Sequence, residues 1–150
     1  MVHEALYRSQ DIAQVDYQEY LIKLSNYLVR SVKGAAKGIE IEIDAKVDLC
    51  LDKAIPLGLL INEVVTNSIN NHFEVVSSGK ISIRIEALEY PNFVMQISDS
   101  GGANNESTNS LGLQLIHNLA LQLRGNIEVE NSLKGNHSTL YFQELKPKNT

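Results

Sequence analysis

The segment from residue 52 to about residue 73 most constrains the fold of this chain. Asp52 can cap a helix there, and Pro56 is tolerated in that helix only within the first turn. The predicted helix is apolar over much of its circumference, at Ile55, Leu57, Leu59, Leu60, Ile61, Val64, Val65 and Ile69. A helix of this kind buries more than one face, so we predict that it packs between other elements.

Polar side chains interrupt the second half of this helix, at Asn62, Glu63, Thr66, Asn67, Asn70 and Asn71. Glu63 and Asn67 are four residues apart and therefore project from the same side of a helix. By spacing alone, a solvated stripe on an amphipathic helix explains them best. The alternative is a functional site, in which the Asn67 amide oxygen binds Mg²⁺ and the Glu63 carboxylate orients a nucleophile.

Helical and alternating patterns predict the remaining elements. Asp16 and Glu19 have capping-box spacing at the start of a helix that ends near Gly34. Further predicted elements are strands at 39–43 and 47–51, a hairpin of 79–89 and 92–98, a Ser110-capped helix at 111–123, and a closing hairpin of 126–131 and 138–143. This order predicts an α/β sandwich of the α+β class, with a mixed, mostly antiparallel sheet and helices packed on one face.

Composition limits the functional class. A chain of 150 residues, 43% apolar and 21% charged, fits one globular domain with a core. Its net charge of -5 argues against a nucleic-acid partner, and a polyanion such as ATP would need oriented donors or a metal ion. The single cysteine, Cys50, excludes an intramolecular disulfide, and no apolar run approaches the ~20 residues of a membrane span. We expect a cytoplasmic domain, whose parent protein could be membrane-anchored through parts outside this sequence.

Two more polar segments follow apolar elements. Ser98–Gly102 ends a strand, and its paired glycines would let a ligand approach the backbone. Ser110–Leu113 opens a helix, where free N–H groups can bind phosphate. In isolation, an ordinary turn and a helix cap explain the two segments better. Residues 100–110 between strand and helix predict a mobile loop, and no P-loop, Rossmann, HExxH, CxxC or GxSxG motif is present in the sequence.

Taken in order, NEVVTNSINNHF, ISDSGG and SLGLQLIHNLALQLRGNIEVENSLKG resemble the ATP-binding domain of the GHKL superfamily, which includes gyrase, histidine kinases and mismatch-repair proteins. The sequence is most similar to sensor histidine kinases whose second dimerisation helix ends in His-Glu-x-Leu-Tyr, here His3, Glu4, Leu6 and Tyr7. DKAIPLGLLINEVVTNS and LGLQLIHNLALQLRG are also typical of that subgroup. The resemblance extends from His3 to about Phe142 and implies the Bergerat type of α/β sandwich.

The resemblance implies a role for each matching residue. Asn67 would coordinate the Mg²⁺ that bridges the ATP phosphates, and Glu63 would be the catalytic polar group near the γ-phosphate. Asp99 would accept a hydrogen bond from the adenine amino group, while Gly101 would let the backbone pass the base. Residues 102–110 would form a lid over ATP. The helix-start amides that would bind the phosphates are those of Leu111, Gly112 and Leu113. The implied chemistry is phosphoryl transfer with ATP and Mg²⁺ as cofactors.

Several positions of this predicted nucleotide site depart from the family pattern. Asn70 stands where many of these kinases carry Lys or Arg, and Asn71 stands at the following His or Tyr position. Ala103 replaces the second glycine of DxGxG, and Gly135-Asn136 replaces a Gly-Thr pair. Loss of one cationic phosphate contact costs about 1.5–3 kcal/mol, or roughly ten- to a hundred-fold in affinity. An alternative is therefore a degenerate domain that binds a protein partner without ATP turnover.

The resemblance also implies the domains and partners. Residues 1–10 would be the remnant of a dimerisation and phosphotransfer helix, residues 11–145 the ATP-binding domain, and residues 146–150 a flexible tail. The phosphoacceptor histidine would lie on an earlier helix, so we expect that this chain alone does not autophosphorylate. The expected partners are the dimerisation domain of the same, homodimeric protein and a response regulator. A serine kinase of the anti-sigma type is a third alternative, which the His-Glu-x-Leu-Tyr start argues against.

Overall fold

The structure, a computed structural model, describes residues 14–31, 38–71, 73, 79–101, 110–132 and 135–145. Along these residues the elements are β1 (Gln14–Asp16), α2 (Tyr17–Ser31), β2 (Ile39–Asp44), β3 (Asp48–Cys50), α3 (Leu51–Asn71), β4 (Gly79–Ala87), β5 (Asn92–Asp99), α4 (Ser110–Gln122), β6 (Asn126–Ser132) and β7 (Gly135–Gln143). The predicted helix remnant at 1–10 and tail at 146–150 lie outside the described residues, as does the predicted lid at 102–110 except for Ser110.

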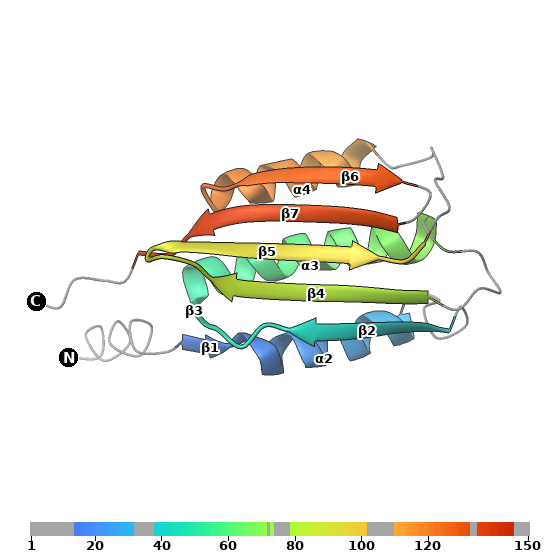
Figure 1. Ribbon diagram of the computed structural model, residues 1–150, viewed down its shortest axis with the longest axis horizontal. Coiled ribbons are helices and arrows are strands. Elements are labelled where there is room, and N and C mark those ends of the chain that lie inside the picture. Colours follow the sequence, from blue (N-terminus) through green and yellow to red (C-terminus); the bar gives the residue numbers. More distant parts are fainter. Residues whose placement is uncertain are drawn as a thin grey trace, which may run out of the picture.

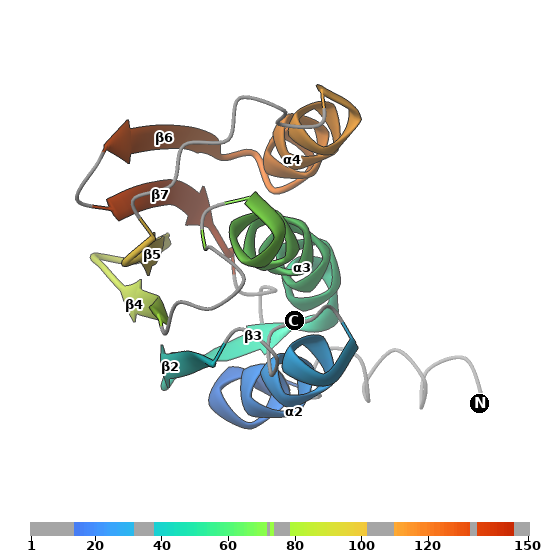
Figure 2. The same cartoon turned by 90° about the vertical axis from the view of Figure 1, so that its right-hand side faces the viewer.

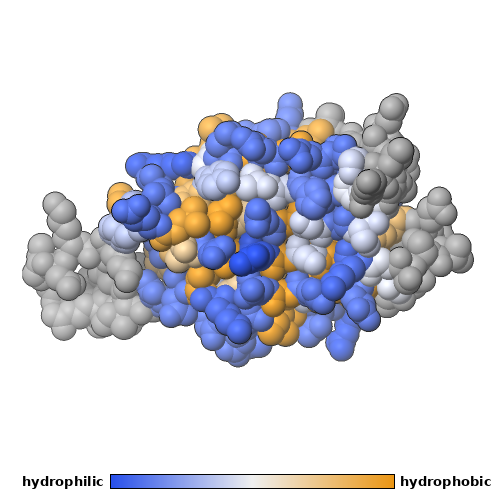
Figure 3. Space-filling model, viewed as in Figure 1, coloured by the Kyte–Doolittle hydropathy of each residue, from blue (hydrophilic) through white to orange (hydrophobic). Residues whose placement is uncertain are grey.

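One five-stranded sheet forms a layer in the order β2-β4-β5-β7-β6, and α2, α3 and α4 cover one of its faces (Figures 1 and 2). β2 pairs with β4 in parallel, and the other neighbouring strands of this sheet are antiparallel. The predicted fold class is therefore confirmed. The opposite face of the sheet is mostly hydrophilic (Figure 3), because alternate strand residues such as Arg84 and Gln96 are exposed.

The hydrophobic core lies between the sheet and the helices. Ile81, Ile83 and Ile85 alternate along β4 and are buried, and Leu57 and Leu60 of α3 are fully buried against the same core. α3 lies between α2 and α4 (Figure 2), which confirms that the long apolar helix packs between other elements. Among the described residues, no helix is both long enough and apolar enough to cross a membrane.

The start of α3 differs from the prediction. The helix begins at Leu51, so Asp52 lies inside the first turn, and Pro56 lies beyond the first turn. Cys50 precedes the helix, and its N–H donates to Oε1 of Glu144 over 2.7 Å. Because the helix begins one residue before Asp52, the prediction that Asp52 caps it is wrong. Pro56 removes an N–H from the helix interior, and the carbonyl that loses this donor belongs to Asp52, which is exposed to water.

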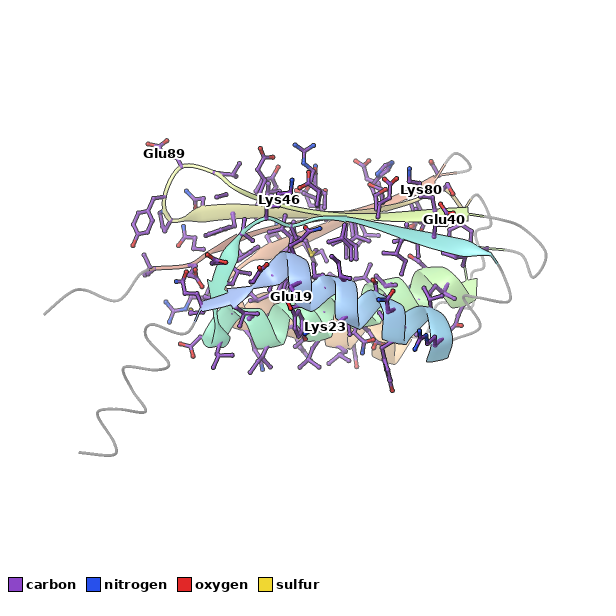
Figure 4. The ribbon with its side chains drawn as sticks, turned by 90° about the horizontal axis from the view of Figure 1, so that it is seen from below. Glu19, Lys23, Glu40, Lys46, Lys80 and Glu89 are labelled. Carbon is purple, nitrogen blue, oxygen red and sulfur yellow. The ribbon has the colours of Figure 1, made fainter. Side chains whose placement is uncertain are left out.

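Residues before α2 form a strand that was not predicted. β1 pairs with β3 in a separate two-stranded sheet, with Val15 opposite Leu49. Asp16 ends β1 and caps α2, because the N–H of Glu19 donates to Asp16 Oδ1 over 3.2 Å. This confirms the predicted cap. The Glu19 carboxylate lies 3.4 Å from Lys23 Nζ, and both side chains are on the exposed surface of α2 (Figure 4).

Candidate functional site

A buried carboxylate lies where β5 ends and β7 begins, at the right of Figure 1. Asp99 is the last residue of β5 and is only 6% exposed. Its Oδ2 accepts a hydrogen bond from the Ser68 hydroxyl of α3 over 2.9 Å. Its Oδ1 accepts from the Gly101 N–H over 3.0 Å and from Asn136 Nδ2 over 2.9 Å. These donors offset the free-energy cost of burying the carboxylate.

A cavity of about 100 Å³ lies beside Asp99, between α3, α4 and the strands β5, β6 and β7. Its apolar lining residues are Val64, Ile97, Leu113, Ile116 and Val129. Its polar lining residues are Asn67, Ser68, Asp99, Asn131, Asn136 and Ser138. Pockets for drug-sized ligands span roughly 300–1,000 Å³, so this cavity has room for a small planar group rather than a whole nucleotide.

Three of the predicted site residues meet at this cavity. Asn67, Asp99 and Leu113 line it, although they come from α3, β5 and α4. Gly101 joins the same cluster through its backbone, because its N–H donates to Asp99 and its carbonyl accepts from Asn136. Gly112 lies in the first turn of α4, directly before Leu113.

The other predicted residues lie around the cavity or outside the described part of the chain. Glu63 is half-buried on α3, one turn before Asn67, and it is not among the residues that line the cavity. Asn70 is exposed, one turn beyond Asn67. Asn71 and Leu111 belong to α3 and α4, but their side chains are outside the described set, and Ala103 lies outside it entirely.

Sequence reasoning missed two residues that bind Asp99. Ser68 directly follows Asn67, and a small hydroxyl in an apolar helix gives no signal by itself. Asn136 was noticed only as a departure after Gly135. In the structure, β7 begins three residues earlier than predicted, and Asn136 is paired with Asp99 of β5.

Gly135 makes this pairing sterically possible. Its φ is 147°, a conformation that favours glycine, and a Cβ at this position would lie 2.5 Å from the Asp99 carbonyl oxygen. The glycine therefore lets β7 start close to the end of β5. The next residue, Asn136, reaches the Asp99 carboxylate as a result.

The polar groups fit a metal ion that arrives with a ligand better than a resident metal centre. Within the described residues, no three His, Cys, Asp or Glu side chains come together as a metal site. Asn67 contributes an amide at the cavity wall, and Glu63 lies one turn earlier on the same helix. Mg²⁺ in nucleotide sites is held by one or two protein oxygens together with phosphates and water. This donor set is compatible with that arrangement.

The sequence matches no protein-family model and no curated relative. The fold is similar to the histidine kinase domain of a blue-light activated histidine kinase from Erythrobacter litoralis, with a TM-score of 0.74 and 22% identity over 91% of this chain and 73% of that one. For the longer structure of that kinase the TM-score is 0.76 at 21% identity, over 86% of this chain and only 42% of that one. The catalytic domain of histidine kinase ThkA gives a TM-score of 0.63 at 17% identity, over 87% and 94% of the two chains. The chain thus has the fold of histidine kinase catalytic domains.

Proposed function

We propose that this chain is the ATP-binding catalytic domain of a sensor histidine kinase of the GHKL superfamily. It would transfer the γ-phosphate of ATP to a histidine on a dimerisation domain of the same protein. The observation that carries the proposal is the buried Asp99 carboxylate beside a small cavity that Asn67 also lines. The likeness in fold to histidine kinase catalytic domains supports it.

The chemistry of Asp99 favours a nucleobase that presents an exocyclic amino group, as adenine does. An ionised carboxylate only accepts hydrogen bonds, so it attracts an amino group and repels a carbonyl oxygen. Adenine carries an amino group where guanine carries a carbonyl. Apolar lining residues, among them Ile97 and Ile116, would contact the faces of the base. The nucleotide we propose is therefore ATP.

The remaining predicted residues would serve the phosphates. The base would lie beside Asp99. The first turn of α4 would then offer the backbone N–H groups of Leu111, Gly112 and Leu113 to the phosphate oxygens. The Asn67 amide would hold Mg²⁺, and Glu63 would orient the attacking group near the γ-phosphate. When bound, Mg²⁺ neutralises the charge that develops on the transferred phosphoryl group. The residues of this chain would act mainly by positioning.

A second candidate is a domain of the same fold that binds a protein partner without ATP turnover. The exposed Asn70 favours it, because this position carries no cation one turn beyond Asn67. The sequence also contains no Lys or Arg from Asn62 to Gly79 or from Asp99 to Leu123. A phosphate group at this site would therefore rely on Mg²⁺ and backbone N–H groups.

Calorimetric titration with ATP and Mg²⁺ distinguishes the two candidates. We expect wild type to bind, and Asn67→Ala to lose about ten-fold or more of the Mg²⁺-dependent affinity, because a ligand to a charged group is removed. Asn26→Ala, at an exposed asparagine of α2, is the matched control and should bind like wild type. Equal binding by wild type and Asn67→Ala would exclude the metal role. No binding by wild type at millimolar ATP would favour the protein-binding candidate.

The proposal also extends to partners. The phosphoacceptor would be supplied by the dimerisation domain of a homodimeric parent protein, and a response regulator would receive the phosphoryl group in the cytoplasm. With labelled ATP, we expect no acid-labile phosphohistidine on this chain alone. Phosphohistidine on the isolated chain would contradict the assignment of the acceptor to another domain.

A further inference from the structure

Asn136 of β7 uses only one of its two polar side-chain atoms. Its Nδ2 donates to Asp99 Oδ1 and to the Gly101 carbonyl oxygen, each over 2.9 Å. A side-chain amide has two N–H hydrogens, and both are used here. Within the described part of the chain, no hydrogen bond reaches Asn136 Oδ1, although the residue is only 6% exposed.

The two acceptors also fix the orientation of the amide. Turning it by 180° would place Oδ1 against the Asp99 carboxylate and the Gly101 carbonyl, which are both acceptors. Oδ1 therefore points away from them. The described residues contain no fully buried side-chain oxygen or nitrogen without a hydrogen-bond partner, so Oδ1 is not sealed in the core. Asn136 lines the cavity, and Oδ1 is its one side-chain acceptor atom that has no hydrogen-bond partner among the described residues.

We propose that Asn136 is a second specificity-determining residue for the base, acting beside Asp99. Its Oδ1 would accept one hydrogen of the exocyclic amino group of a 6-aminopurine, and Asp99 would accept the other. The inference rests on the proposed function, because it concerns the same nucleotide site. Two neighbouring acceptors match an unsubstituted amino group, which carries two hydrogens, and they do not match a substituted amine.

N6-methyl-ATP tests the second acceptor directly. The methyl group removes one hydrogen and adds a carbon in a cavity of only about 100 Å³. We expect wild type to bind ATP about ten-fold more tightly than N6-methyl-ATP, since one acceptor would lose its partner. In Asn136→Ala, the methyl group can take the space of the missing carboxamide. ATP affinity should then fall about ten-fold, while N6-methyl-ATP affinity stays within about two-fold of the wild-type value.

Two further variants separate recognition from folding. Asn126→Ala, at an exposed asparagine of β6 that does not line the cavity, is the matched control and should keep the preference for ATP. Asn136→Val keeps a residue that favours strands and also removes both polar atoms, so it should lose the preference as Asn136→Ala does. Urea unfolding of each variant establishes that the titrated protein is folded.

Each outcome decides the proposal. Loss of the ATP preference in both Asn136 variants, with the preference kept in Asn126→Ala, supports it. An equal loss of affinity for both nucleotides would limit Asn136 to holding Asp99 and would overturn it. If the Asn136 variants do not fold, wild type decides, because equal binding of ATP and N6-methyl-ATP overturns this inference alone. A wild type that binds neither nucleotide overturns the proposed function together with the inference.

Discussion

At the scale of single residues, the carboxylate of Asp99 connects three elements that are distant in sequence. Ser68 of α3, Gly101 after β5 and Asn136 of β7 all donate to it. Hydrogen bonds to a charged acceptor each contribute about 1.5–3 kcal/mol, and in a low-dielectric site they strengthen one another. Asp99 therefore both stabilises this end of the fold and presents acceptor atoms to the cavity.

Asp99→Asn should separate these two effects. Asparagine can still accept from Gly101 and Asn136 through its oxygen, and its amide can donate to the Ser68 hydroxyl oxygen. The hydrogen bonds to a neutral amide are weaker, but burying it costs less than burying a carboxylate, so we expect the free energy of unfolding to change by about 1 kcal/mol or less. ATP affinity should fall by roughly a hundred-fold because an acceptor becomes a donor. Urea unfolding and ATP titration measure the two quantities. Asp48→Asn, at an exposed aspartate of β3, should change neither, and unimpaired ATP binding by Asp99→Asn would refute the role of Asp99.

Asn70→Lys should strengthen nucleotide binding. The position is exposed one turn beyond Asn67, so a lysine there could reach the phosphates of a nucleotide bound as proposed. One added cationic contact should raise ATP affinity about ten-fold. Asn26→Lys makes the same change of charge on α2 and should have little effect. If both variants change ATP affinity equally, net charge rather than a contact at Asn70 is responsible.

The sequence was sufficient for some residues of the site and not for others. Asn67 and Asp99 could be predicted because each interrupts a strongly apolar element. Ser68 could not, since nothing in α3 indicates which small polar residue meets β5. Asn136 lies 37 residues from Asp99, and their contact depends on the register of β5 against β7. A shift of one residue would have pointed Asn136 away from the helices.

At the scale of elements, α3 is held by polar contacts at both ends and by apolar packing along its length. Glu144 accepts from Cys50 at the start of the helix, and Ser68 donates to Asp99 near its end. The apolar periodicity was enough to predict the helix and its burial. The predicted cap at Asp52 was wrong because the helix begins one residue earlier, at Leu51. The contact between Glu144 and Cys50 could not be predicted, because the two residues are 94 positions apart in sequence. β1 was missed for a related reason, because a strand of three residues has too short an alternation to detect.

Removing the Glu144 side chain should destabilise the domain. The residue is 4% exposed, and Glu144→Ala would leave the Cys50 N–H without its acceptor. We expect the free energy of unfolding to fall by about 1–3 kcal/mol, measured by urea titration. Glu144→Gln keeps an acceptor oxygen and should cost less. Glu128→Ala, at an exposed position of β6, should change stability by less than about 0.5 kcal/mol, and a similar small effect for Glu144→Ala would show that the contact contributes little.

The same contact should make the Cys50 thiol slow to react. Burial, reinforced by the Glu144 carboxylate, raises the pKa of Cys50 from 9.0 to about 11. Because the folded pKa lies above the unfolded one, the stability that the thiol contributes is complete below pH 9 and is lost as the pH rises towards 11. We expect the pH profile of iodoacetamide alkylation to have its midpoint near pH 11 in the folded protein and near pH 9 in urea. A folded midpoint at or below pH 9 would contradict the burial of the thiol.

At the scale of the whole molecule, alternation and helical periodicity were enough to predict the layers and the class of sheet. They gave no information on how the ends of β5, β7 and α3 meet, because that depends on contacts between residues far apart in the chain.

Net charge acts at this scale as well. The molecule carries a charge of -5. Two segments that contribute residues to the cavity contain no Lys or Arg, namely Asn62 to Gly79 and Asp99 to Leu123.

This charge distribution predicts an unusual response to salt. Sites built from Lys and Arg lose affinity for phosphates when salt screens them, whereas here the long-range interaction between protein and nucleotide is repulsive. The screening length falls from about 30 Å at 0.01 M to about 8 Å at 0.15 M ionic strength, so added salt should remove this repulsion. At constant free Mg²⁺, we expect ATP affinity to rise by up to about two-fold over this range. Asn70→Lys should reduce the gain, and a ten-fold loss of wild-type affinity with salt would mean that a cationic group contacts the phosphates after all.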